Sequence, residues 1–250
     1  MKRLALVLSL ICLMAGGSKA QDVFNHIALG VEVGTAGAGV QIAAPLGSMF
    51  QARFGYSMIP PVSLQKTFSV PEHPGSAVTG RGEDVSIDAK ATPNFSGLNL
   101  LFDFFPVEDN GFHITAGLSY GPKDVIRVTN VTPLPQDYNT VGLDVDGYTV
   151  RAINNKFEGY IGVNSFRPYV GVGLGRAVNP DRRVNVTADL GVLYWGKPGL
   201  YAPGEPLVGD MVDVRVTSAS LNGRDQGLLS KAEKFIVYPM MNVHVFVNLF

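Results

Sequence analysis

Six ionisable residues occur in stretches where apolar and polar residues alternate, and each lies in the polar phase of its stretch: Glu32, Arg53, Asp103, His113, Asp189 and His244. Residues two apart in a β-strand point to the same face. We therefore expect the six side chains to form a polar network in one enclosed interior. Uncharged polar residues share the phase, among them Gln41, Gln51, Asn99, Asn185 and Thr187.

Ion pairing is the simplest chemistry open to these residues. Charges enclosed away from water must be paired, and Arg53 could pair with Glu32 or Asp103. Buried polar groups are as a rule hydrogen-bonded, so we predict a closed polar plug. The same side chains could instead line a gated pore or a proton path, because ionisable groups inside a membrane often mark such routes.

Catalysis would need a nucleophile beside a general base. His113 shares its face with Thr115 and Ser119, whereas Phe246 occupies the position two residues after His244. A single inward histidine is more typical of a hydrogen-bonded filler. We therefore expect no catalytic residue and no enzyme activity, and a hydrolase that modifies lipid A ranks third among the functions considered.

Metal and cofactor sites have equally weak signals. The acid pairs Asp144/Asp146 and Asp210/Asp213 each offer two carboxylates, whereas Ca²⁺ prefers six or more oxygen ligands. The glycines at 171, 173 and 175 alternate within a predicted strand and precede no helix, so they do not predict a nucleotide-binding loop. We expect no metal and no cofactor.

The elements that position these residues are eight predicted strands, and we expect about nine to eleven residues of each to cross the membrane. They cover 25–33, 39–46, 50–58, 96–105, 112–120, about 157–174, 184–195 and 235–250. In the last one, Met241 to Leu249 alternates strictly. In the sixth, the phase changes near 164–168, which we interpret as a bulge within one long strand; a hairpin there would give ten strands instead of eight.

The first 20 residues predict a secretory signal peptide. Lys2 and Arg3 precede an apolar run of about a dozen residues, and small residues at Ser18 and Ala20 predict cleavage before Gln21. Cys12 lies in this segment, so the rest of the chain has no cysteine and no disulfide chemistry. Loss of its three basic residues changes the formal net charge from −1 to −4. A chain with this charge lacks the excess of basic residues that is typical of nucleic-acid-binding proteins.

Composition and connection lengths predict one domain, 21–250, that crosses a membrane with strands. The mean hydropathy is +0.17, and 16% of residues are charged. Alternating strands can show one face to lipid only in a closed barrel. Long polar connections at about 60–93, 121–156 and 196–234 alternate with short turns. Long loops on the extracellular side and short turns on the periplasmic side are typical of bacterial outer-membrane barrels.

The sequence resembles the small outer-membrane β-barrel proteins, the group of the outer-membrane protein A transmembrane domain and outer-membrane protein W. The glycine-rich strand 167–175, the Ala188–Gly191 segment and Phe250 carry this resemblance, together with the signal peptide. It implies an all-β, eight-stranded antiparallel up-and-down transmembrane barrel in the outer membrane of a Gram-negative bacterium. We expect a monomer in contact with lipopolysaccharide, with a structural or surface-interaction role and a ligand contacted through its loops. A narrow channel or carrier for small apolar molecules is the alternative.

Overall fold

The computed structural model describes residues 26–70, 85–107, 110–132, 143–145, 148–150, 156, 158–204, 212–216 and 234–249. The predicted signal peptide, with Cys12, and the terminal Phe250 therefore lie outside the described residues. So does one member of each acid pair, Asp146 and Asp210. Regular secondary structure in the described ranges is all β. None of the described segments forms a helix that is long and apolar enough to cross a membrane.

Eight strands form a closed antiparallel barrel. They are β1 (Ala28–Gly34), β2 (Gly37–Pro45), β3 (Phe50–Met58), β6 (Ser96–Phe104), β7 (His113–Tyr120), β12 (Phe166–Leu174), β13 (Val184–Tyr194) and β16 (Val237–Asn248). Their order around the barrel is β1-β16-β13-β12-β7-β6-β3-β2. The first and last strands close it, with Val31 opposite Val245. The eight-stranded prediction is confirmed, and the described residues give no ten-stranded barrel.

The barrel has its apolar residues outside and its charged residues inside. Val31 and Val186 are 59% and 58% exposed, whereas Arg53 is 1% exposed. Strict alternation along each strand produces this division, as in β16, where Met241, Val243, Val245 and Val247 face out and Asn242, His244 and Phe246 face in. A water-soluble barrel would bury the opposite set of residues.

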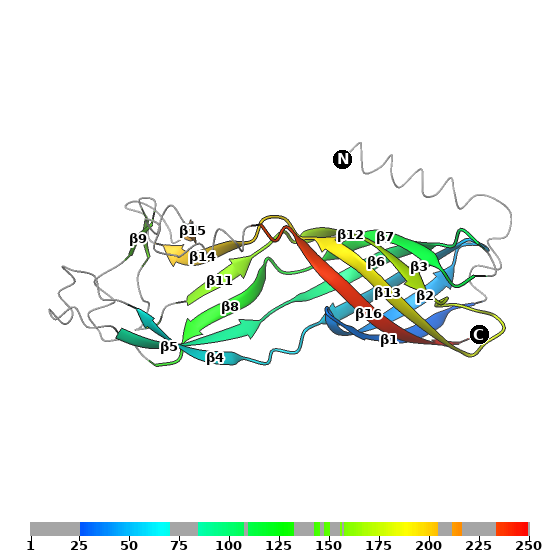
Figure 1. The fold of residues 1–250 in the computed structure, drawn as a ribbon, viewed down its shortest axis with the longest axis horizontal. Helices are drawn as coiled ribbons and strands as arrows, with labels where there is room; N and C mark the ends of the chain where they lie inside the picture. The colour runs from blue at the N-terminus through cyan, green and yellow to red at the C-terminus, as the bar shows by residue number, and fades with distance from the viewer. Residues whose placement is uncertain are drawn as a thin grey trace, which may run out of the picture.

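A second, open sheet continues the barrel at one end (Figure 1). It contains β4 (Leu64–Val70), β5 (Val85–Pro93), β8 (Asp124–Asn130), β11 (Glu158–Gly162), β14 (Gly199–Gly204) and β15 (Val212–Val216), in the order β15-β14-β11-β8-β5-β4. β9 (Leu143–Val145) and β10 (Tyr148–Val150) form a separate pair. The three long connections, which we expected as loops, thus contain strands in their described parts. We call the barrel end next to this sheet the sheet rim, and the opposite end, with the short connections, the turn rim.

The predicted sixth strand is two strands, so its interpretation as one bulged strand is wrong. β11 pairs with β8 and β14 in the open sheet, whereas β12 pairs with β7 and β13 in the barrel. Between them, the amides of Val163 and Asn164 bond to the carbonyls of Lys123 and Trp195. The phase changes because the chain leaves one sheet and enters another at these residues.

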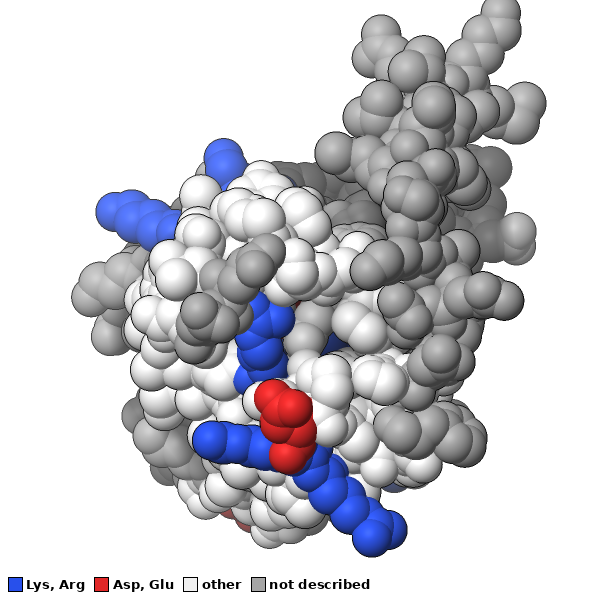
Figure 2. Space-filling view, turned by 90° about the vertical axis from the view of Figure 1, so that its right-hand side faces the viewer, with Lys and Arg blue, Asp and Glu red and all other residues white. Residues whose placement is uncertain are grey.

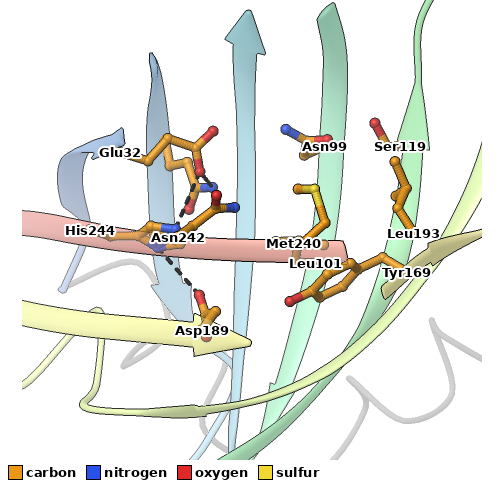
Figure 3. Close-up of a pocket in the computed structure, with 11 residues that line it drawn as sticks. Glu32, Asn99, Leu101, Ser119, Tyr169, Asp189, Leu193, Met240, Asn242 and His244 are labelled. Carbon is orange, nitrogen blue, oxygen red and sulfur yellow. Dashed lines mark hydrogen bonds and ion pairs between the residues drawn. The ribbon is translucent and has the colours of Figure 1, made fainter. Parts of the chain in front are cut away.

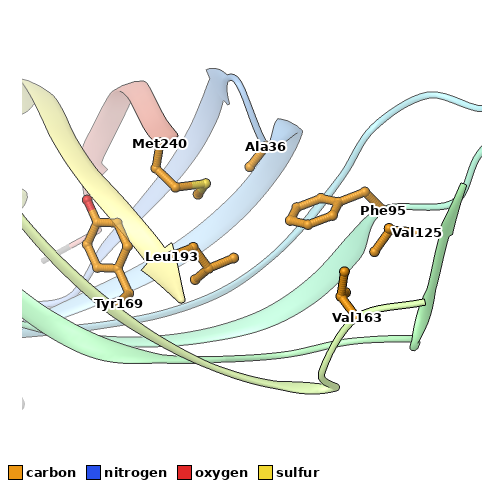
Figure 4. Close-up of a cluster of buried hydrophobic side chains, with 7 residues drawn as sticks. All are labelled: Ala36, Phe95, Val125, Val163, Tyr169, Leu193 and Met240. Atoms are coloured by element: carbon orange, nitrogen blue, oxygen red, sulfur yellow. The ribbon is translucent and has the colours of Figure 1, made fainter. Parts of the chain in front are cut away.

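Two apolar clusters close the barrel interior. Ala28, Ala43, Ala177, Val178 and Phe246 form one at the turn rim. The other lies at the sheet rim and continues beneath the open sheet; it contains Ala36, Phe95, Val125, Val163, Tyr169, Leu193 and Met240 (Figure 4). Two aromatic residues at the ends of barrel strands pack inside the protein instead of facing a membrane interface. Phe105 is fully buried, and Trp195 packs against the sheet-rim cluster.

Candidate functional site

Arg53 lies at the centre of the barrel interior and holds two carboxylates. Its Nη1 donates to Asp189 Oδ2 at 2.6 Å, and its Nη2 donates to Asp103 Oδ1 at 2.7 Å. All three side chains are at most 3% exposed. The two acids lie on different strands, β6 and β13. One guanidinium therefore links three strands by charge-assisted hydrogen bonds, which are the strong kind.

His113 reinforces the same cluster from β7. Its Nε2 lies 2.8 Å from Asp189 Oδ1, and its Nδ1 lies 3.1 Å from the carbonyl oxygen of Gly111. Phe105 packs on the imidazole with 5.1 Å between ring centroids. Both ring nitrogens thus meet acceptors, an arrangement that a doubly protonated imidazole satisfies. With both nitrogens engaged, His113 is not poised to activate Thr115 or Ser119.

His244 connects the cluster to Glu32. Its Nδ1 lies 3.1 Å from Arg53 Nη1, and because arginine only donates, this nitrogen is the acceptor. The proton then belongs on Nε2, which lies 3.3 Å from Glu32 Oε2. Gln41 donates to the same carboxylate oxygen at 2.6 Å. Glu32 is thus partnered by His244 and Gln41, and the pairing with Arg53 that we considered from the sequence is not formed.

Glycine leaves room for the ion pairs on β12. Gly173 lies opposite Asp189 on one side and opposite His113 on the other. A Cβ atom at this position would lie 2.3 Å from Asp189 Oδ1 and 2.3 Å from His113 Nε2. The alternating glycines of this strand therefore make space for larger side chains that reach across the interior.

The interior leaves a cavity of only about 20 Å³ between the ionic cluster and the sheet-rim apolar residues. Glu32, Asn242 and His244 lie on one side of it, and Tyr169, Leu193 and Met240 lie on the other (Figure 3). A water molecule needs about 10–15 Å³ of such space. The cavity can hold about one water and no larger solute.

The turn rim is closed by the chain that joins β12 to β13. Gln51 donates to the carbonyl of Val178 at 2.7 Å and accepts from the amide of Ala177 at 3.1 Å. The guanidinium of Arg176 covers the Phe105 ring at 4.0 Å. Figure 2 looks onto this end and shows basic and acidic side chains near its middle and further basic side chains at its upper left edge. Both ends of the interior are thus filled.

Sequence reasoning missed one buried cation, Arg167. It is fully buried at the sheet rim, where its Nε donates to the carbonyl of Asn164 at 2.7 Å and its Nη2 donates to the carbonyl of Pro122. Its guanidinium lies 5.0 Å from the centre of the Phe95 ring. The sequence did contain a signal for this position. Arg167 lies two residues before Tyr169 and four before Gly171, so it is in the same phase and shares their inward face.

The open sheet carries a separate row of large side chains on one face. Tyr201 lies opposite Tyr160 and Arg215, and Arg127 lies opposite Tyr160. The two tyrosine rings stack with 5.2 Å between centroids. Asp124 accepts from Arg127 at 2.6 Å, and this hydrogen bond raises the pKa of the exposed guanidinium. Groups of three or more metal-ligating side chains are absent from the described part of the chain.

The fold defines the class: an all-β protein built on a closed, eight-stranded antiparallel barrel. No known family model matches the sequence, and no curated protein matches it. Solved structures with a similar fold include CarO2 of Acinetobacter baumannii, at 16% identity and a TM-score of 0.47, covering 89% of this chain and 98% of that one. CarO of the same organism has 18% identity and a TM-score of 0.45, and the match covers 88% of this chain and 96% of that one.

A major outer membrane protein of Thermus thermophilus gives 14% identity and a TM-score of 0.37, covering 90% of this chain and 98% of that one. The name of the Thermus protein places that protein in an outer membrane. The similarity of the three structures to this chain is too low to carry a conclusion about its function, which has to come from the chain's own residues.

Proposed function

We propose that this protein is a non-enzymatic outer-membrane β-barrel with a plugged interior, which presents its open sheet and long connections to the outside of the cell. One observation carries the proposal: the barrel exposes its apolar side chains and encloses its charged ones. Apolar residues alternate with inward polar ones on all eight strands, and such an exterior is stable only against lipid.

The plug is supported by the contacts of the six interior residues. Arg53, His113 and His244 each contact at least one of the three carboxylates of Glu32, Asp103 and Asp189. An interior that these contacts cross and that two apolar clusters close has little room for a conducting path. The role we infer is therefore a rigid anchor whose outer sheet and connections make surface contacts, since binding functions concentrate on such segments.

The finer assignment, to the outer-membrane protein A or outer-membrane protein W group, rests on the sequence resemblance alone. The alternative function, a channel or carrier for small molecules, has less support because the interior cavity has room for about one water. The lipid-modifying hydrolase has the least support, since both nitrogens of His113 already face acceptors.

Two experiments test this proposal. The mature chain refolded into detergent should migrate faster on a gel before boiling than after it, and it should insert into lipid vesicles. In planar bilayers it should give no steady single channels. A chain that stays monomeric in water without detergent contradicts the membrane assignment. Steady channels that disappear in an Arg53→Ala variant contradict the plug.

A further inference from the structure

We propose that Lys123, Lys197 and Lys234 form a binding site for the phosphate groups of an acylated membrane lipid whose headgroup carries two phosphates. The site lies on one side of the sheet rim. This inference deepens the proposed function and rests on it, because the barrel must sit in a membrane with the sheet rim in the outer leaflet.

The three lysines occupy equivalent places at the ends of neighbouring strands. Lys123 lies three residues beyond the end of β7, and Lys197 lies three residues beyond the end of β13. Lys234 lies three residues before the start of β16. β7, β12, β13 and β16 are consecutive in the barrel order. All three side chains are exposed, so their ammonium groups can reach the same lipid headgroup layer.

A continuous backbone ladder fixes the segments that carry them. The amide of Val163 bonds to the carbonyl of Lys123 at 2.9 Å, and the next amide, Asn164, bonds to Trp195 at 2.8 Å. The amide of Trp195 bonds in turn to Ile236 at 3.2 Å. Neighbouring strands lie about 4.8 Å apart, so the lysine backbones span on the order of 15 Å along the rim. This width suits a headgroup with two phosphates better than a single small anion.

The surface directly beneath the lysines is apolar and aromatic. Tyr120, Phe166, Tyr194 and Phe235 are between 46% and 66% exposed, one from each of these four strand ends. Aromatic side chains of this kind lie at the boundary between the lipid headgroups and the acyl chains. A ligand on this surface would therefore place acyl chains on the barrel wall and its phosphates at the lysines.

The three lysines supply the positive charge of the site. Among the described residues, none of the three lysines has an acidic side chain within ion-pair distance. Asp124, which follows Lys123 in the sequence, is occupied by Arg127 at 2.6 Å and by Asn94 at 2.9 Å. Lysine is a point charge well suited to phosphate oxygens.

The other half of the same rim carries no such charge. Its described segments, 34–38, 58–63 and 93–97, contain neither lysine nor arginine. A general attraction to an anionic surface would need no preferred side. The one-sided placement, above the aromatic residues of the same four strands, points to one bound lipid.

The test uses the full mature chain refolded in a zwitterionic detergent. Diphosphorylated lipid A is titrated, and binding is followed by the fluorescence of Trp195, the chain's single tryptophan, which lies two residues from Lys197. Dephosphorylated lipid A and inorganic phosphate are titrated in parallel. We expect binding of the phosphorylated lipid at least tenfold tighter than either, and weaker binding at higher salt, since exposed charges are screened.

The variant Lys123→Gln/Lys197→Gln/Lys234→Gln should lose at least tenfold in affinity for the phosphorylated lipid. The matched control, Arg182→Gln/Arg183→Gln, removes two exposed cations from the opposite rim and should bind like the wild type. Equal affinity of the lysine variant and the wild type overturns the site. Equal affinity for the dephosphorylated lipid, or for inorganic phosphate, overturns the choice of ligand.

Gel mobility before and after boiling, measured on the same samples, separates the two proposals. A wild-type chain that folds into detergent and inserts into vesicles, but does not distinguish the two lipids, overturns this inference alone. A chain that fails to fold into detergent or vesicles overturns the membrane proposal and this site with it.

Discussion

Arg53 and Asp189 form an ion pair across the full width of the barrel, with 2.6 Å between Nη1 and Oδ2. They are 136 residues apart in the sequence. Their strands, β3 and β13, are four steps apart in a ring of eight, so they stand on opposite walls. A contact between opposite walls limits how far the barrel can flatten, and it stabilises a round, filled interior.

Removing the guanidinium should destabilise the barrel more than any other single interior change. Arg53→Ala would leave Asp103 and Asp189 buried without their cation, and breaking a buried pair in this way costs about 3–5 kcal/mol. The measurement is urea unfolding in lipid vesicles, followed by the fluorescence of Trp195. Arg182→Ala, on the exposed turn between β12 and β13, is the control. If Arg53→Ala unfolded at the same midpoint urea concentration as the wild type, this ion pair would not stabilise the fold.

Gly173→Ala should destabilise the barrel by disturbing a second ion pair. Its new methyl group would lie 2.3 Å from both His113 Nε2 and Asp189 Oδ1, so these side chains would have to separate. We expect a loss of about 1–3 kcal/mol, typical of overpacking, in the same urea measurement. Val172→Ala changes the neighbouring outward residue, 44% exposed, as a control. A Gly173→Ala variant as stable as this control contradicts the tight packing described here.

A charge on the barrel exterior should destabilise the inserted state according to its depth. Leu190 is near the middle of β13 and Tyr194 is its last residue, and both face outward. Leu190→Arg should cost about 2–4 kcal/mol in vesicles, and Tyr194→Arg about 0–1 kcal/mol. The stabilities of both variants are compared by vesicle unfolding. Equal costs at the two positions would mean that lipid does not surround this strand.

Arg167 should hold the open sheet to the barrel. Its guanidinium bonds to the carbonyls of Pro122 and Asn164, which lie in the two connections β7–β8 and β11–β12. Arg167→Ala should therefore lower the local stability of β8 and β11 by about 1–3 kcal/mol. Amide hydrogen exchange should become faster in these two strands, while β3 and β13 stay protected. Arg176→Ala, at the opposite rim, is the comparison. If exchange in β8 and β11 were unchanged, the apolar cluster at the sheet rim, and not Arg167, would stabilise the contact between the open sheet and the barrel.

Most of the barrel is predictable from the sequence because alternation reports directly on the two environments of a strand. The predicted bounds of β3 match the structure, and those of β13 differ by one residue. The inward phase of all six ionisable residues follows from the same pattern. The open sheet is not predictable in this way, because its short strands carry polar residues and prolines that resemble those of loops.

The pairing of the interior charges was beyond the sequence for a different reason. Alternation gives the face of a side chain but not its partner across the lumen. Arg53 thus meets Asp103 and Asp189, while Glu32 meets His244. The location of Phe105 inside the barrel depends in the same way on Arg176 and His113, which contact its ring from other parts of the chain.

The sequence by itself determined that strands with one apolar and one polar face would have to close on themselves, because period-2 alternation is a local property of each strand. Only the tertiary structure decided which charges meet, where the chain passes from the open sheet into the barrel at 163–165, and which lysines gather on one side of the rim. These depend on strand order and register, which bring together residues more than a hundred positions apart.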